Sequence, residues 1–360
     1  MTAPTRSIDR EVLKEKQQII GGYATGMLQS GVIWLGVDLG LFRALGDGQA
    51  RTSSDLAAQL EMSERVVLEW LRSAATGGLL DYEGDDAFRL GPEVASLLAD
   101  ERNIASLIWP FMHLPSRVAL WPHVKDSFAT GIGYGWDMRG QEGIEWMEAG
   151  FRNWYEQVLV QRALPAVDGL VPRLEQGMRA ADVGCGAGIA LVEMGRAFPR
   201  SEFHGYDSSR NAIARAKGNA AAAGLTNVSF HVVPDELLPD DQSLGLVTTF
   251  DCMHDMTRPH DVARAIRAAL ADDGVWFIAD IDGRASFEEN LADNPLSARF
   301  YANSLFGCLQ SALSEPGGAG YGTLGLPEPT MRDLVLGAGF TSFQRVDLPS
   351  PINAYYEARP

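Results

Sequence analysis

The chain has 360 residues, 46% hydrophobic and 21% charged, as is typical of a globular protein with two domains. Its formal net charge of −17 opposes a polyanionic partner such as DNA, unless a local basic patch overcomes the overall field. Three widely spaced cysteines form neither a disulfide framework nor a metal-binding pattern, and we find no secretory signal and no membrane-length apolar run, so we expect a cytoplasmic protein with no membrane partner.

The first third of the chain is predicted to be helical. Residues 9–45 carry apolar side chains at helical spacing, with a dense apolar block between Val32 and Phe42 that ends at the Gly46-Asp47-Gly48 break. A helix this apolar is either part of a core or, as we expect here, a surface that a second subunit covers. We therefore predict a homodimer formed through the N-terminal region.

A winged helix is predicted next. A short capped helix spans residues 52–60, and a second helix begins at Ser63, whose side chain we expect to cap it, and ends before a Gly-Gly pair. Two short strands, 79–82 and 87–90, flank an acidic turn and form the wing.

Winged helices can bind DNA, so a transcription regulator is an alternative class of function. Residues 52–98 contain only three basic side chains against nine acidic ones. Neutralising phosphates needs several lysines or arginines on one face, and this segment lacks them. We therefore do not expect a nucleic-acid partner.

The stretch from residue 102 to 170 is predicted to be helical and is rich in aromatic side chains, including five of the eight tryptophans. A glycine-rich break, residues 131–135, interrupts it. These aromatic residues suit the wall of a pocket for an apolar small molecule, although ordinary core packing explains any single one equally well. The candidate pocket residues are Trp109, Phe111, Met112, Trp136, Trp154 and Tyr155, the last offering a polar tip.

From Gly177 onward, strands and helices alternate, which predicts a mostly parallel α/β sheet. Helices are expected over 209–223 and 259–270. Seven strands are expected, over 180–183, 202–206, 228–233, 246–250, 274–279, 343–347 and 354–358.

A glycine-rich turn between the first of these strands and its helix is the strongest motif in the chain. It reads Asp182-Val-Gly184-Cys185-Gly186-Ala-Gly188. Glycine is needed where a cofactor approaches the backbone, because a Cβ would clash. Asp207 follows the second strand, where a carboxylate would bind a ribose diol, although capping of the next helix explains it too.

Two classes of cofactor use this geometry. A dinucleotide site wants G-x-G-x-x-G and places a pyrophosphate at the helix start, where anionic Asp182 would be unfavourable. The same carboxylate suits the sulfonium and ammonium groups of S-adenosyl-L-methionine, whose product is S-adenosyl-L-homocysteine. We therefore expect S-adenosylmethionine as the cofactor.

The turn resembles motif I of class I S-adenosylmethionine-dependent methyltransferases, and the likeness extends over nearly the whole chain. Residues 249–256 resemble the motif after strand four of small-molecule O-methyltransferases, and 269–275 resemble their turn before strand five. The chain is most similar to actinobacterial and mycobacterial enzymes with an N-terminal winged-helix dimerisation domain.

The resemblance implies an α/β fold, a Rossmann-like seven-stranded methyltransferase domain preceded by a mostly helical winged-helix dimerisation domain. It implies a dimerisation domain over 1–100, an aromatic helical connector and pocket wall over 101–170, and the cofactor-binding methyltransferase domain over 171–360. The activity implied is methyl transfer to a small molecule, such as a compound of secondary metabolism.

His254 is the candidate catalytic base, paired with Asp255. In the O-methyltransferases that the chain resembles, a histidine of a His-Asp pair after strand four takes the proton from the acceptor hydroxyl, and neutral imidazole suits that role. The tryptophan that usually follows is Met256 here. A histidine that only lines the pocket or caps a loop is the alternative.

Further carboxylates and a phenylalanine are expected around the site. Phe250 and Asp251 end the fourth strand near the methionine end of the cofactor, and Ser208 follows Asp207. Asp235 is assigned to the adenine amino group, in competition with a solvated surface charge. Asp280, like Asp282, lies after strand five, where it would orient His254 or bind substrate.

A C-methyltransferase that acts next to a carbonyl with a metal is a further alternative. His254 would be one ligand, but the only other histidine nearby, His260, falls on the following helix. One ligand without a partner is weak support for a metal, so we predict none.

Overall fold

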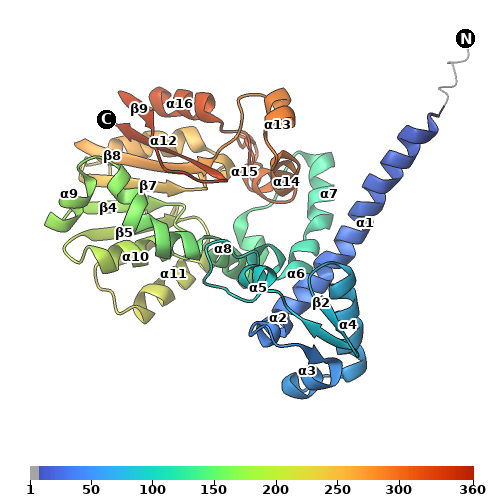
Figure 1. Cartoon of the computed structure of the whole chain (residues 1–360). Helices are drawn as coiled ribbons and strands as arrows, with labels where there is room; N and C mark the ends of the chain where they lie inside the picture. The colour runs from blue at the N-terminus through green and yellow to red at the C-terminus, as the bar shows by residue number, and fades with distance from the viewer. Residues whose placement is uncertain (1–7) are drawn as a thin grey trace, which may run out of the picture. The chain divides into compact units, whose positions relative to one another are not determined.

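The computed structural model describes residues 8–360, which form two compact units that divide between Leu114 and Pro115. Residues 1–7, the first part of the segment in which we expect no secretory signal, lie outside the described residues. Figure 1 labels helices and strands of both units.

The first unit begins with a long helix. Helix α1 (Arg10–Asp38) starts at Asp9, whose carboxylate accepts hydrogen bonds from the backbone N–H groups of residues 11 and 12. The expected single helix is divided, because Gly40 adopts a φ of 71° before α2 (Leu41–Leu45) begins.

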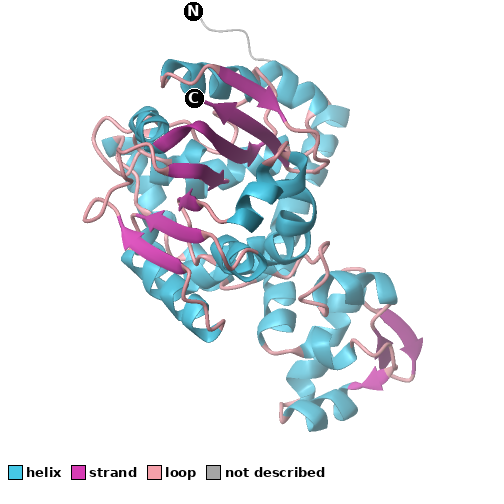
Figure 2. Cartoon of the chain, turned by 90° about the vertical axis from the view of Figure 1, so that its left-hand side faces the viewer, coloured by secondary structure: helices cyan, strands magenta, loops and turns pink. Residues whose placement is uncertain are grey.

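The winged helix is confirmed. Helices α3 (Ser53–Leu60) and α4 (Glu64–Thr76) precede the hairpin of β2 (Asp81–Gly84) and β3 (Ala87–Arg89). A short strand that we did not predict, β1 (Arg51–Thr52), pairs with β3, so the sheet order is β1-β3-β2 (Figure 2). Helix α5 (Pro92–Leu98) and the 3-10 helix η1 (Trp109–Phe111) follow.

The two helix starts differ in how they are capped. Thr52 forms a reciprocal capping box with Asp55 at the start of α3. Ser63 occupies the N-cap position of α4, but its side chain makes no capping hydrogen bond, so the expected cap is wrong. The core of this unit instead holds α4 in place, with Trp70 and Leu71 packed among buried apolar side chains, and the Trp70 Nε1 group donates to the Val32 carbonyl at 2.9 Å.

All three arginines of the winged helix are ion-paired with carboxylates. Arg65 pairs with Glu69 on the same helix face. Arg72 reaches Asp86 in the wing, and Arg89 contacts both Asp81 and Glu83. No uncompensated cationic face is therefore available for phosphates within residues 52–98.

The second unit opens with helices, as predicted. They are α6 (Leu114–Val118), α7 (Trp121–Thr130), the 3-10 helix η2 (Trp136–Arg139), α8 (Gly140–Trp154), the π-helix η3 (Tyr155–Ala163), the 3-10 helix η4 (Leu164–Ala166) and α9 (Leu170–Gln176). Gly131, with a φ of 69°, ends α7 in the glycine-rich segment that we expected to interrupt the helices.

The seven predicted strands are confirmed and form one sheet in the order β6-β5-β4-β7-β8-β10-β9. Strands β4 to β8 pair in parallel, and β10 pairs antiparallel with β8 and β9. Their bounds are β4 (Arg179–Val183), β5 (Glu202–Asp207), β6 (Val228–Val232), β7 (Leu244–Phe250), β8 (Leu270–Ile281), β9 (Ser342–Arg345) and β10 (Asn353–Arg359).

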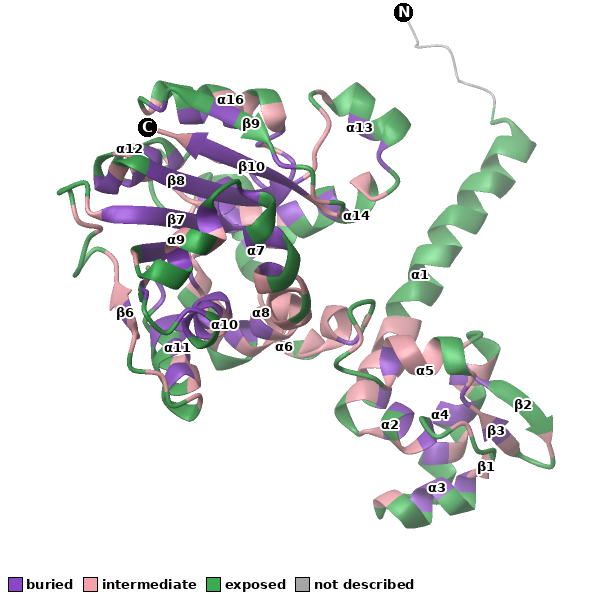
Figure 3. Cartoon of the chain, turned by 60° about the vertical axis from the view of Figure 1, so that its left-hand side comes forward, coloured by how far each residue is buried: buried purple, intermediate pink, exposed green. Residues whose placement is uncertain are grey.

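Helices cover both faces of this sheet. The core on one face packs β4, β5 and β7 against α9, α10 (Ile189–Ala197) and α11 (Arg210–Ala222). The core on the other face packs the sheet against α12 (Pro259–Ala269) and α16 (Glu328–Gly337). The central strands are therefore buried on both sides (Figure 3).

Shorter helices lie between these elements along the chain. They are the 3-10 helix η5 (Met253–Asp255), α13 (Phe287–Asp293), α14 (Ser297–Asn303), the π-helix η6 (Ser304–Cys308) and α15 (Leu309–Ala312). Among the described residues, no helix has both the length and the apolar character needed to cross a membrane.

Helix α1 exposes much of its apolar surface within the first unit (Figure 3). Tyr23, Met27 and Leu28 are 74%, 64% and 68% exposed, and no charged residue occurs between Lys16 and Asp38. A long uncharged apolar surface of this kind is typical of one that another protein surface covers.

We expect that this surface binds a second copy of the chain. Light scattering should then give twice the 39.1 kDa of one chain, and the double substitution Tyr23→Glu and Met27→Glu should yield monomers. Leu291→Glu, at a position 70% exposed in the second unit, is the control and should stay dimeric. A monomeric wild-type protein would contradict this expectation.

Candidate functional site

Four carboxylates lie at one edge of the large sheet, where the parallel strands have their carboxyl ends. Asp182 is in β4, Asp207 ends β5, Asp251 follows β7, and Asp280 is in β8. Strand β4 lies between β5 and β7, so the chain order reverses at this point of the sheet. Ligands of open α/β sheets bind at such a switch point.

The three glycines of the turn all adopt a positive φ, at 75°, 52° and 72° for Gly184, Gly186 and Gly188. A Cβ at Gly184 would lie 2.7 Å from the Cys252 sulfur, and one at Gly188 would lie 2.5 Å from the Phe230 ring, so packing requires these two glycines. A Cβ at Gly186 would meet nothing within 4 Å. The Gly186 backbone therefore borders open space that suits a ligand.

Asp207 binds the turn rather than serving only as a helix cap. Its Oδ2 accepts a hydrogen bond from the Gly186 N–H at 2.9 Å, and its Oδ1 accepts from the Ser209 N–H at 2.8 Å. Ser209 is itself the N-cap of α11. Burial raises the pKa of Asp207, and these backbone hydrogen bonds oppose that effect. A carboxylate has further lone pairs, so Asp207 can still accept from a ribose diol.

Asp182 is 2% exposed and accepts a hydrogen bond from the Thr248 hydroxyl at 2.7 Å. Burial raises its pKa to about 7, while the Thr248 hydrogen bond opposes this shift. A positively charged ligand group nearby would favour the ionised carboxylate. Asp182 therefore suits a cation, as its sequence position predicted.

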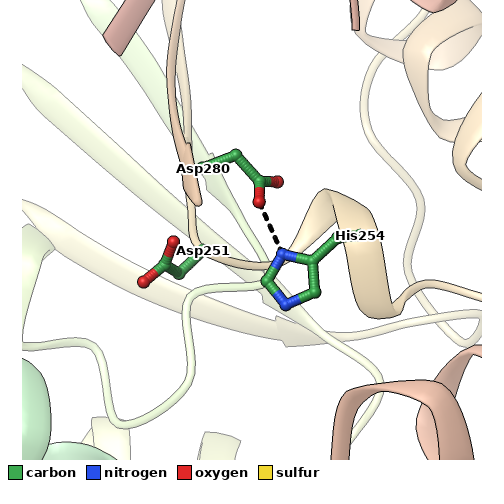
Figure 4. A group of neighbouring side chains, drawn as sticks. All are labelled: Asp251, His254 and Asp280. Atoms are coloured by element: carbon green, nitrogen blue, oxygen red, sulfur yellow. Dashed lines mark hydrogen bonds and ion pairs between the residues drawn. The ribbon is translucent and has the colours of Figure 1, made fainter. Parts of the chain in front are cut away.

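His254 and Asp280 form a buried pair (Figure 4). The His254 Nδ1 lies 2.5 Å from Asp280 Oδ1, and the two side chains are 3% and 1% exposed. Asp280 Oδ1 also accepts from the Ile281 N–H at 2.8 Å, which fixes the carboxylate. The short helix η5, which follows β7, carries the histidine into this position.

Two opposing effects set the charge of His254. Burial lowers the pKa of the imidazole, but the charges and hydrogen bonds of Asp280 and Cys308 outweigh it and raise this pKa well above its ordinary value. The contact with Asp280 therefore favours the protonated form of the His254 imidazole.

Asp255 does not make the contact that orients His254. Its carboxylate accepts from the Trp136 Nε1–H at 2.8 Å, and burial raises its pKa to about 6. Asp282 lies outside the pair as well, in an ion pair with Arg345 at 3.1 Å. The structure thus places Asp280, rather than Asp255, next to the imidazole.

Asp251 completes the group of residues around His254. It adopts a φ of 52°, and its Oδ1 accepts from the Asn353 amide at 2.5 Å. Burial and the nearby Asp280 charge raise the pKa of Asp251 to about 7. Each of Asp251, His254 and Asp280 offers a possible metal ligand atom within 4.8 Å of the others.

Asp251 and Asp280 are possible metal ligands beside His254, which the sequence alone did not identify as such. However, the Asp251 carboxylate points away from the imidazole, and the hydrogen bond to Asp280 occupies His254 Nδ1 (Figure 4). A metal bound to this ring would therefore have to use Nε2.

Several other predicted residues lie near this sheet edge. Cys185 is buried in the turn, and its N–H donates to the Tyr206 carbonyl at 3.1 Å. Phe250 is a core residue whose ring contacts Trp154 and Tyr155. Burial, followed by the charges of the Asp182 and Asp251 carboxylates, raises the pKa of Tyr155 well above its ordinary value.

The remaining assignments stay predictions. Asp235 is exposed and forms an ion pair with Arg210 at 2.6 Å, and Ser208 is exposed beside Asp207. Trp109 and Met112 belong to the first unit, whereas the site belongs to the second.

The sequence did not single out Thr248, Asn353 or Cys308. Thr248 lies in β7, two residues before its end at Phe250, and its hydroxyl donates a hydrogen bond to Asp182. Asn353 is 102 residues from Asp251 in the chain and reaches it only through the pairing of β10 with β8. Contacts of this kind depend on sheet register and leave no local pattern in the sequence.

Two family models match the chain. Residues 174–317 match a methyltransferase domain, and residues 29–100 match an Rv2258c-like winged helix-turn-helix domain. The predicted combination of these two domains is therefore confirmed.

Curated relatives support the same domain over part of the chain. The chain is 31% identical over 122 residues to a ubiquinone biosynthesis O-methyltransferase of Paracidovorax citrulli, covering 33% of this chain and 49% of that protein. A protein of the same name from Bordetella avium is 32% identical over 103 residues, covering 28% and 41%. The chain thus spans about half the length, or less, of the curated relatives it matches.

Solved structures share the fold along nearly the whole chain. An O-methyltransferase family protein from Burkholderia thailandensis has a TM-score of 0.69 at 18% identity, covering 98% of each chain. Human N-acetylserotonin methyltransferase, solved in complex with S-adenosylmethionine, has a TM-score of 0.68 at 18% identity, covering 99% of each chain. The predicted fold class is confirmed.

Matched alanine substitutions separate packing from ligand binding in the turn. Gly186→Ala should fold, at a cost of about 1–2 kcal/mol for its φ, and should lower S-adenosylhomocysteine affinity tenfold or more, because its Cβ enters the open space. Gly188→Ala adds a clash with Phe230 and should lose about 3 kcal/mol of stability. Calorimetry and thermal melting measure these effects. Unchanged affinity in Gly186→Ala would disprove the assignment.

Proposed function

We propose that this chain, which joins a methyltransferase domain to a winged helix-turn-helix domain, transfers a methyl group from S-adenosylmethionine to the hydroxyl of a small molecule. The observation that carries the proposal is the buried His254–Asp280 pair at the sheet edge that also holds the glycine turn. The names of the curated relatives, both O-methyltransferases, agree with a hydroxyl acceptor.

The residues of the turn suit this cofactor. The backbone at Gly186 leaves room for the ligand, Asp207 would bind the ribose, and Asp182 would favour the positive charge. When bound, S-adenosylmethionine supplies an electrophilic methyl group. We assign supporting cofactor contacts to Ser208, Asp235, Phe250, Asp251 and Cys185 on the grounds of their positions at the same strand ends.

His254 would take the proton of the acceptor hydroxyl at Nε2, because its Nδ1 is committed to Asp280. The ring must be neutral for this step, and the raised pKa of His254 works against the neutral form. Once the acceptor proton has moved, the Asp280 carboxylate stabilises the imidazolium that forms. Asp280 is therefore a positioning residue and His254 the catalytic one.

Two alternatives are less well supported. DNA binding by the winged helix lacks a cationic face, since all three of its arginines are ion-paired with carboxylates. Metal-assisted C-methylation would need Asp251 as a ligand beside His254, but the Asp251 carboxylate points away from the imidazole. In place of DNA binding, we propose that the winged helix contributes to a homodimer.

Replacing His254 with alanine should lower turnover a hundred-fold or more, because the proposed base is then missing. Calorimetry should show unchanged cofactor affinity. His260→Ala is the matched control, since that exposed histidine lies on α12 and its Nε2 interacts with the Tyr321 hydroxyl at 3.1 Å. Turnover that hardly changes in the His254 variant would mean that positioning alone drives the reaction.

The pH profile tests the role of Asp280. In the wild-type protein, kcat/KM should rise with pH as His254 loses its proton, with an inflection above the ordinary histidine pKa. Asp280→Asn removes the charge that stabilises the imidazolium, so the inflection should move to lower pH while turnover falls. Asp282→Asn should leave the inflection in place, and a profile of Asp280→Asn identical to that of the wild type would exclude the pair as the titrating group.

A further inference from the structure

Three arginines come together near the candidate site in the second unit. Arg139 ends η2, Arg117 belongs to α6, and Arg299 belongs to α14. Burial, together with the positive charges of Arg139 and Arg299, lowers the pKa of Arg117 to about 10. The three guanidinium groups therefore lie close enough to act on one another electrostatically.

Arg139 has the geometry of an anion-binding group. Its Nε and Nη2 atoms are buried, and neither has a hydrogen-bond partner among the described residues. The guanidinium lies 4.3 Å from the Trp136 ring centroid and 5.3 Å from that of Tyr134, so two aromatic faces fix its plane. Buried donors without partners are rare in proteins and point to a missing acceptor.

Two glycines make room for this arginine. A Cβ at Gly143, one turn later in α8, would overlap the Arg139 side chain. A Cβ at Gly307 in η6 would lie 3.5 Å from Arg139 Nη2, so any longer side chain there would cover the guanidinium. The acid nearest in sequence, Asp137, instead accepts a hydrogen bond from the Ser209 hydroxyl.

The Trp136 side chain links the Arg139 guanidinium to a neighbour of the proposed base. Trp136, on which the guanidinium stacks, donates its Nε1–H to Asp255, the neighbour of His254 in the chain. Gly307 precedes Cys308, whose thiol interacts with the His254 imidazole. Helices η2 and η6 thus connect the guanidinium to His254 by two separate routes.

We propose that the acceptor carries a carboxylate that binds the Nε–Nη2 edge of Arg139, while its hydroxyl faces His254. This inference rests on the proposed function. A planar guanidinium edge with two parallel N–H donors matches a carboxylate in a bidentate contact. The neighbouring tryptophan and tyrosine rings suit an aromatic acid, so the substrate class is a hydroxylated aromatic carboxylate.

The test compares hydroxylated benzoates and naphthoates with their carboxamides, which have the same shape without the charge. Calorimetry on the full-length protein, with and without S-adenosylhomocysteine, should show that at least one acid binds tenfold or more tightly than its amide. Arg139→Gln should abolish this preference and leave S-adenosylhomocysteine affinity unchanged. Arg264→Gln, an exposed arginine paired with Asp261, should behave as the wild type.

Thermal melting shows whether the variants fold. If Arg139→Gln does not fold, Arg139→Lys decides, because a lysine keeps the charge but loses the bidentate edge and should reduce the preference severalfold. Equal binding of every acid and its amide, or an acid preference that persists in the folded variant, would overturn the proposal.

The two proposals can fail separately. Acids that bind through Arg139 but accept no methyl group from labelled cofactor would leave the anion site standing and disprove the function. Methyl transfer to uncharged acceptors at the same rate as to their acids would support the proposed function and disprove the anion site.

Discussion

Burial of carboxylates at one edge of a parallel sheet is the constraint on which the site depends. Asp182 and Asp280 are almost fully buried, and desolvation raises the pKa values of Asp182 and Asp251 to about 7. A buried acid of this kind needs hydrogen bonds or a positive neighbour to stay ionised. Thr248 and Asn353 donate hydrogen bonds to two of these acids, and His254 supplies positive charge to a third.

The same constraint separates the site into two parts with different chemistry. At β4 and β5, Asp182 and Asp207 border the Gly186 backbone and favour a cationic ligand group with a diol. At β7 and β8, Asp280 holds the imidazolium of His254. A small acceptor between these parts would meet a methyl donor on one side and a proton acceptor on the other, which is the arrangement that proximity catalysis requires.

Local sequence patterns predicted the parts of this molecule that depend on short-range order. The turn from Asp182 to Gly188, its following acid and all seven strands follow from glycine spacing and from alternating elements. The sequence offered Asp255, Asp280 and Asp282 as possible partners of His254. Only the register of β7 with β8 selects Asp280 among them. Cap geometry at Ser63 also depended on more than residue type.

In the aromatic helices too, the sequence predicted the residue types but not their contacts. Their tryptophans were expected to form an apolar wall, yet Trp136 binds Asp255 with its Nε1–H and supports Arg139 with its ring face. A tryptophan can do both because its polar edge and its π-face point in different directions. An anionic group held at Arg139 would therefore be coupled to the residues around His254 through one rigid side chain. The distance between a substrate's charged group and its reacting hydroxyl would then decide which acids are accepted, so this part of the fold would set specificity as well as shape.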